Sequence, residues 1–211
     1  MPARIVIADD HPLFRAALGH AVSSVWPGAT LIETSSAAQA RAALAEPTDC
    51  LLLDLHMEDS HGLNALMDFR QDFPAVPVVI VSASEEERVY DAAEQLGAAA
   101  FIPKSASLDQ MRKALGVVRE GDSWFPETTG ERDEDLAKIE SLTPAQRRIL
   151  DRMRAGLLNK QIAYELSISE ATVKAHITAI FRKLDVISRT QAAMLAAKLD
   201  VDQPAAGTGS A

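Results

Sequence analysis

Carboxylates follow two of the short apolar runs in the first half of the chain. Asp9 and Asp10 come directly after Arg4–Ala8, and Asp54 comes directly after Cys50–Leu53. If these runs are neighbouring strands of a parallel sheet, the three carboxylates converge at the carboxyl ends of the strands. Converging carboxylates repel one another, and a hard divalent cation with oxygen ligands, such as Mg2+, relieves that repulsion. We therefore expect a Mg2+ site formed by these residues.

Two further polar side chains follow apolar runs later in the chain. Ser82 comes directly after Val78–Val81, and Lys104 stands just beyond Ala99–Ile102. The lysine can offer a cation to a phosphoryl oxygen, and the serine can offer a hydroxyl. Helix caps and turns would explain any one of the five polar residues. The full set at successive strand ends predicts chemistry on a phosphoryl group.

The apolar runs alternate with amphipathic segments, which predicts an α/β fold. Five strands and five helices in alternation indicate a doubly wound, five-stranded parallel sheet, flavodoxin-like, with right-handed crossovers and strand order 2-1-3-4-5. The expected strands are Arg4–Ala8, Thr30–Thr34, Cys50–Leu53, Val78–Val81 and Ala99–Ile102. The expected helices are His11–Ser24, Ala37–Leu44, Asn64–Asp72, Glu85–Leu96 and Leu108–Glu120.

This constellation resembles the receiver domain of two-component systems over the first 120 residues. The resemblance implies that Asp54 is the phosphoacceptor, and that Asp9, Asp10, Asp54 and the backbone carbonyl of His56 bind Mg2+. It also implies a switch pair and a phosphoryl-binding lysine, which are Ser82, Phe101 and Lys104.

The chain departs from the receiver pattern at two places. Glu58 stands where a proline is common, and we expect it to be a solvated loop residue. Pro103 precedes Lys104 and Ser105 follows it, so the family's cis peptide after the lysine is not expected, because a cis bond before serine is costly. The five histidines lack metal-ligand spacing as a set, and His56 and His61 are expected at solvated loop positions.

The segment Asn159–Ala192 predicts two short helices joined by a tight turn, followed by a third helix. Ser169 is a candidate N-cap for the second of them. That helix carries cationic and hydroxyl side chains on its polar sides, the layout of a helix-turn-helix that reads DNA. The polar residues are Thr172, Lys174, His176, Thr178, Arg182 and Lys183.

The amino-acid sequence of this segment resembles the LuxR-type helix-turn-helix of NarL/FixJ response regulators, an all-α domain of four helices. The resemblance implies base contacts by Lys174, Ala175 and Thr178. It implies contacts to the DNA backbone by Asn159, Lys160, Thr172, Lys183, Ser188 and Arg189. A homodimer on an inverted repeat of double-stranded DNA is expected. Ala192, Leu195 and Ala196 match the family's dimer contact, but they could equally be core residues.

Charge divides the chain in the same way as the motifs. The net charge of −9 separates into −8 over residues 1–120, −5 over residues 121–140 and +4 over residues 141–211. Only the last segment is basic, as phosphate binding requires. We therefore expect a receiver over 1–120, an acidic linker over 121–140, a DNA-binding domain over 141–200 and a disordered tail over 201–211. Without a leader or a membrane span, a cytoplasmic protein is expected.

Together these observations predict a DNA-binding transcriptional regulator, not an enzyme, that a sensor histidine kinase controls by phosphorylating Asp54. One alternative is a Mg2+-dependent phosphohydrolase using Asp54, but we find no cap insertion or second acid that would serve it. The other is a helix-turn-helix regulator that responds to a small signal. An aromatic-lined ligand cavity would be needed there, and only 5% of the residues are aromatic.

Overall fold

The computed structural model describes residues 2–128 and 133–200. The chain divides into two compact units, Met1–Arg132 and Asp133–Ala211, and each is described by itself. The predicted disordered tail, 201–211, lies outside the described residues. Within the described ranges, no helix combines the length and the apolar character needed to cross a membrane.

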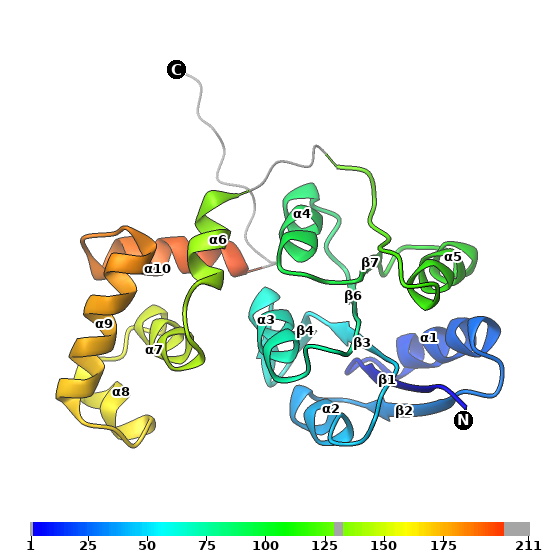
Figure 1. Cartoon of the computed structure of the whole chain (residues 1–211), viewed down its shortest axis with the longest axis horizontal. Helices are drawn as coiled ribbons and strands as arrows, with labels where there is room; N and C mark the ends of the chain where they lie inside the picture. Colours follow the sequence, from blue (N-terminus) through cyan, green and yellow to red (C-terminus); the bar gives the residue numbers. More distant parts are fainter. Residues whose placement is uncertain (1, 129–132, 201–211) are drawn as a thin grey trace. The chain divides into compact units, whose positions relative to one another are not determined.

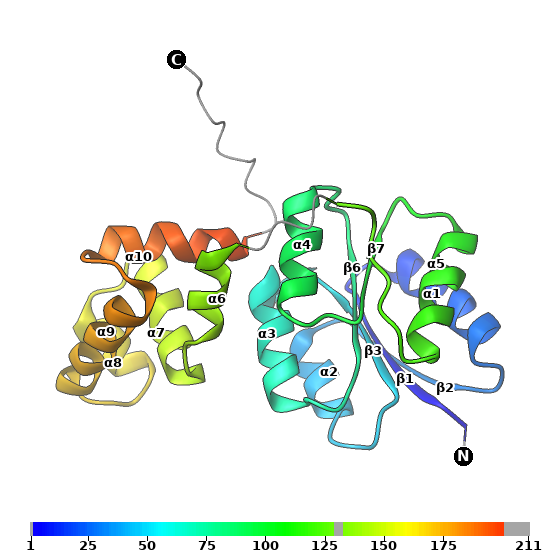
Figure 2. The ribbon, with the colours of Figure 1, turned by 45° about the horizontal axis from the view of Figure 1, so that its top comes forward.

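The first unit is a parallel five-stranded sheet with helices on both faces (Figure 2). The strand order β2-β1-β3-β6-β7 confirms the predicted doubly wound order. The strands of this sheet are β1 (Arg4–Ala8), β2 (Thr30–Thr34), β3 (Cys50–Asp54), β6 (Val78–Ser82) and β7 (Ala100–Pro103). The helices are α1 (Pro12–Val25), α2 (Ala37–Ala43), α3 (Leu63–Asp72), α4 (Glu87–Gln95) and α5 (Leu108–Arg119). As Figure 1 shows, α1 and α5 pack side by side.

Continuous apolar sequence places β3 and β6 in the middle of the sheet. Every residue of both strands is buried, as expected where helices cover both faces. Cys50 belongs to this core, and its burial, with a smaller contribution from Asp49, raises the pKa of its thiol to about 12. The thiol is therefore protonated at neutral pH and acts as a packing group.

Two local features differ from the expected elements. The helix α4 begins at Glu87 rather than Glu85, and Glu86 makes no side-chain capping bond. A small antiparallel hairpin, β4 (His56–Met57) with β5 (Ser60–His61), follows β3. Strands of two residues are too short to show an alternating pattern, so the sequence did not predict them. The peptide after Lys104 is trans, as expected.

The predicted linker region, 121–140, contains ordered structure at both ends. Trp124 lies beside β7 as an extra parallel bridge to Ala100, and its carbonyl accepts a hydrogen bond of 3.1 Å from the Phe101 amide. At the other end, α6 (Glu134–Glu140) buries Leu136 and Ile139 in the second unit. Residues 129–132 lie outside the described ranges.

In its described part, residues 133–200, the second unit is built of helices. Beyond α6 it contains α7 (Pro144–Arg154), α8 (Asn159–Glu165), α9 (Glu170–Leu184), α10 (Arg189–Ala196) and a short 3-10 turn, η1 (Ala197–Leu199). The predicted cap is confirmed, because the Ser169 hydroxyl accepts a 3.0 Å hydrogen bond from the Thr172 amide. Ala192 and Ala196 are fully buried, which makes them core residues of this unit rather than surface contacts.

The turn between α8 and α9 sets the angle of the two helices. Ser167 has a φ of +54°, in the left-handed region that costs a residue with a side chain about 1–2 kcal/mol. Its amide donates to the carbonyl of Tyr164, and the next amide donates to the carbonyl of Ala163. The backbone bonds thus hold a conformation that glycine would adopt without strain.

We therefore predict opposite effects for two serines in this turn. Ser167→Gly should leave stability unchanged or raise it by about 1 kcal/mol, because relief of strain exceeds the added freedom of the unfolded chain. Ser169→Ala should cost about 1 kcal/mol, because the cap is lost. Urea unfolding of the fragment 133–211, followed by circular dichroism, measures both. If Ser167→Gly lowered the free energy of unfolding as much as Ser169→Ala does, Ser167 would not be strained.

Candidate phosphoryl site and nucleic-acid interface

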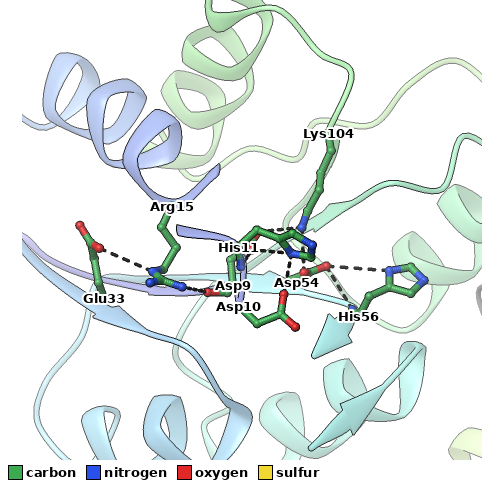
Figure 3. A network of polar contacts seen from close by, with 8 residues as sticks. All are labelled: Asp9, Asp10, His11, Arg15, Glu33, Asp54, His56 and Lys104. Carbon is green, nitrogen blue, oxygen red and sulfur yellow. Dashed lines mark hydrogen bonds and ion pairs between the residues drawn. The ribbon is translucent and has the colours of Figure 1, made fainter. Parts of the chain in front are cut away.

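The three predicted carboxylates meet at one edge of the sheet (Figure 3). Asp9 follows β1 and Asp54 ends β3, and these strands are neighbours with Ala8 opposite Leu53. The side chains of Asp9 and Asp54 are buried, whereas Asp10 is partly exposed. Two buried like charges at this spacing need a counter-charge.

Lys104 supplies that counter-charge. Its Nζ lies 2.8 Å from Oδ2 of Asp9 and 2.8 Å from Oδ2 of Asp54. Burial alone would lower the pKa of Lys104, but the bonds to Asp54 and Asp9 outweigh it and raise that pKa above its usual value. The ammonium also lies 5.0 Å from the centre of the Phe14 ring. Lys104 is therefore a permanent cation between the two carboxylates.

The residues just beyond Asp54 hold its other oxygen. The amide of His56 donates to Oδ1 of Asp54 at 3.1 Å, and the His56 ring is partly buried, with Nδ1 3.9 Å from the same oxygen. The expectation of a solvated loop position was therefore wrong for His56, because β4 folds it beside the carboxylate. Glu58, between β4 and β5, is exposed as expected. The side chain of His61 lies outside what the structure describes.

The two predicted switch residues are both buried. Ser82 ends β6, and its hydroxyl accepts a 3.2 Å hydrogen bond from the amide of Ser84. Its carbonyl accepts a 2.7 Å bond from the amide of Lys104, which ties the strand ends together. Phe101 lies on β7 with its ring 4.6 Å from that of Tyr90 on α4, centre to centre. The ring contact between Phe101 and Tyr90 therefore links β7 directly to α4.

Sequence reasoning missed two residues of this site, His11 and Arg15. Nδ1 of His11 lies 2.6 Å from Oδ1 of Asp10 and 3.4 Å from Oδ1 of Asp9. Arg15 donates from Nη1 to the carbonyl of Asp9 at 2.5 Å, and its Nε lies 3.6 Å from Oε2 of Glu33. His11 was missed because the five histidines were judged together by their spacing, although His11 directly follows Asp9 and Asp10.

The donor groups fit a divalent cation. One ligand atom each from Asp9, Asp10, His11 and Asp54 lies within 4.8 Å of the others. Oδ2 of Asp9 is buried and lies 2.8 Å from Nζ of Lys104, and Oδ1 of Asp10 is buried and lies 2.6 Å from Nδ1 of His11. Carboxylate oxygens gathered in this way suit a hard cation such as Mg2+.

The helix α9 presents the expected base readers to solvent. Lys174, Ala175 and Thr178 are all exposed. Nζ of Lys174 lies 3.1 Å from Oε1 of Glu170, one turn earlier. The hydroxyl of Thr178 donates to the carbonyl of Lys174 at 3.1 Å, so it is turned toward its own helix. Each side chain keeps further capacity, because the ammonium has three N–H donors and the hydroxyl oxygen can still accept a hydrogen bond.

The residues expected at the DNA backbone fall into two groups. Lys160 and Thr172 are exposed. The others bond within the unit: Arg189 donates to Oδ1 of Asn159 at 3.3 Å and to the carbonyl of Leu157, Ser188 caps α10, and Lys183 donates to the carbonyl of Ser141 at 2.6 Å. These four side chains hold α8, α10 and the end of α6 in place.

Comparison with known proteins agrees with both units. Residues 5–116 match the response regulator receiver domain, and residues 140–196 match the luxR family of bacterial regulatory proteins. The chain is 39% identical to the glycerol metabolism activator of Pseudomonas putida, over 93% of this chain and 96% of that protein. It is 32% identical to the nitrate/nitrite response regulator protein NarL of Escherichia coli K12, over 92% and 94% respectively.

The fold agrees as well. A structure of the RcsB response regulator of Salmonella typhimurium matches with a TM-score of 0.56 at 19% identity, over 93% of this chain and 99% of that one. A receiver sheet and a luxR-type helical domain thus occur in one chain, in the order found in the curated relatives. The protein belongs to the response regulators that join a receiver domain to a luxR-type DNA-binding domain.

Proposed function

We propose that Asp54 accepts a phosphoryl group from a phosphohistidine of a sensor histidine kinase. An oxygen of the Asp54 carboxylate attacks phosphorus, the bond from phosphorus to the histidine nitrogen breaks, and an acyl phosphate forms. The observation that carries the proposal is the position of Lys104, bonded at once to Asp54 and Asp9. Once Asp54 is phosphorylated, the ammonium can follow the negative charge onto the new phosphoryl oxygens.

A divalent cation at this site would be held by Asp9, Asp10, Asp54 and the carbonyl of His56. When bound, Mg2+ supplies positive charge that offsets the charge of the three carboxylates and of the incoming group. The amide of His56 keeps Oδ1 of Asp54 fixed, which leaves Oδ2 as the oxygen whose partner changes on phosphorylation.

The signal leaves the site through Ser82 and Phe101. A phosphoryl group adds about −1.5 to −2 charge and three acceptor oxygens at the end of β3. The Ser82 hydroxyl then gains a stronger acceptor, and Phe101 repacks against Tyr90, which biases α4 between two packings. Phosphorylation in this way controls a homodimer that binds an inverted repeat of DNA.

The second unit reads that DNA with α9. Lys174 can donate to guanine and Ala175 can contact a thymine methyl group, while Lys160 and Thr172 contact phosphates. One neighbour in fold, RcsB, has been solved as dimers bound to DNA. Transcriptional regulation in the cytoplasm, without turnover of a substrate, follows from this proposal.

Asp54 should be the site of phosphorylation. A small phosphodonor with Mg2+ should add one phosphoryl group to the whole chain, and Asp54→Asn should abolish it. Asp10→Asn is the matched control: it weakens cation binding, so it should slow labelling yet reach the same end point at high Mg2+. Intact-protein mass spectrometry measures the added group, and labelling that survives Asp54→Asn would disprove the assignment.

Lys104→Gln should bind Mg2+ more tightly than the wild-type chain. The ammonium occupies one oxygen of Asp9 and one of Asp54, so its removal frees both and deletes a repelling charge. Tightening of about three- to tenfold is expected from the loss of one nearby charge. Calorimetric titration with Mg2+ tests this, and Lys113→Gln, on an exposed part of α5, removes the same charge far from the strand ends. Weaker binding by Lys104→Gln would contradict the expectation.

Three lysines of the second unit should behave differently on DNA. Lys174→Ala should weaken binding to the preferred sequence by about 1–3 kcal/mol and should reduce the sequence preference at one base pair. Lys160→Ala should weaken all duplexes alike and reduce the log-salt slope by about one. Lys183→Ala should lower stability with little change in that slope, because its ammonium binds the Ser141 carbonyl.

Titrations of specific and scrambled duplexes at several salt concentrations measure all three effects. Equal losses from Lys174→Ala on both duplexes would rule out base reading. If Lys183→Ala reduces the log-salt slope as much as Lys160→Ala does, Lys183 contacts the DNA backbone after all.

A further inference from the structure

The hairpin that begins at His56 is fastened to a distant part of the chain. Its turn, between β4 and β5, consists of Glu58 and Asp59. The carboxylate of Asp59 accepts a 2.8 Å hydrogen bond from the amide of Ala37 at Oδ1 and a 2.9 Å bond from the amide of Ala38 at Oδ2. Both amides belong to the first turn of α2, where a helix has no backbone acceptor of its own to offer them. One side chain therefore joins the tip of the hairpin to the start of α2.

This contact completes a ring of bonds around the acidic site. The amide of Asp9 donates to the carbonyl of Thr34, the last residue of β2, at 3.1 Å, and α2 follows directly after β2. On the opposite side, the amide of His56 donates to Oδ1 of Asp54 at 3.1 Å. The strands that lead to Asp9 and Asp54 are paired with each other, and the Asp59 contact connects them by a second route through β2, α2 and the hairpin.

The turn itself offers little internal restraint. A proline, which is common in receivers at the position of Glu58, would fix φ at about −65°, whereas glutamate leaves φ free. The hairpin pairs only two residues of each strand, and an isolated hairpin is marginally stable at best in water. Although Asp59 is exposed, both of its carboxylate oxygens are bonded. The position of the hairpin should therefore depend on this side chain.

We propose that Asp59 is a positioning residue for the divalent cation of the phosphorylation site. Its two bonds hold the hairpin, and with it the backbone carbonyl of His56, in place beside Asp9 and Asp54 before the cation arrives. A ligand that is already fixed loses less conformational freedom on binding, so the cation binds more tightly. In this role Asp59 contacts neither the cation nor the phosphoryl group. The inference rests on the proposed function, which assigns the His56 carbonyl to the cation.

The test is made on the full-length chain with Mg2+ as the probe. Asp59→Ala should weaken Mg2+ binding about tenfold in calorimetric titration, the lower end of the loss expected for an outer-shell partner. The His56 amide should exchange its hydrogen faster in NMR. Labelling by a small phosphodonor should need about tenfold more Mg2+ to reach half of its maximal rate. The maximal rate itself should stay near that of the wild type, because Asp54 and Lys104 are unchanged.

Three matched variants separate positioning from other effects. The hydroxyl of Ser36 caps the same helix by accepting a 3.2 Å bond from the amide of Gln39, so Ser36→Ala should weaken α2 and keep the wild-type affinity for Mg2+. Glu58→Gln removes the same charge from the adjacent exposed position and should change the affinity much less, because exposed charges are screened. Asp59→Asn is neutral but keeps one accepting oxygen, so its affinity should fall between those of the wild type and Asp59→Ala.

The proposal would be overturned if Asp59→Ala or Asp59→Asn bound Mg2+ as tightly as the wild type. It would also be overturned if Ser36→Ala or Glu58→Gln weakened binding as much as Asp59→Ala, or if Asp59→Asn and Asp59→Ala were equal, since helix stability or charge would then be the cause. Failure of the proposed function looks different. In that case the wild-type chain binds Mg2+ but gains no phosphoryl group at Asp54.

Discussion

Like charges forced together at the end of the sheet are the constraint on which the first unit depends. Parallel strand order brings Asp9 and Asp54 to neighbouring strand ends, and burial removes the water that would screen them. Lys104, directly after the end of β7, joins the two, and its amide donates to the carbonyl of Ser82 at the end of β6. We propose that a change of charge at Asp54 acts first on Lys104 and, through it, on the strands that carry Ser82 and Phe101.

In the second unit, caps, a tight turn and side-chain hydrogen bonds hold the exposed, cationic helix α9 against its neighbours. Capping serines start α9 and α10, and a left-handed residue turns the chain between α8 and α9. Arg189 binds across to Asn159, and Lys183 binds back to the end of α6. Lys183 and Arg189, which were expected at the DNA backbone, thus bond within the unit, whereas Lys160 and Lys174 are exposed and are the lysines that we propose contact DNA.

The sequence predicted the contacts that follow from a repeating pattern and did not predict single side-chain bonds between distant residues. The strand order and the meeting of Asp9, Asp54 and Lys104 followed from alternating periods, because parallel strands put their carboxyl ends on one edge. The bonds of Lys183 to Ser141 and of Arg189 to Asn159 did not, because they join residues 42 and 30 positions apart with no shared pattern. His11 was missed for a different reason: adjacency to Asp10 shows nothing about ring direction until Pro12 is known to start the helix.

The central claim is that the charge at Asp54 controls the affinity of the chain for DNA. It is tested most directly by measuring the affinity of the full-length chain for its preferred duplex before and after phosphorylation, at one salt concentration, beside Asp54→Asn treated in the same way. We predict that phosphorylation tightens binding by the wild-type chain and leaves Asp54→Asn unchanged. Equal affinity of the wild-type chain in both states, with phosphorylation of Asp54 verified, would contradict the account.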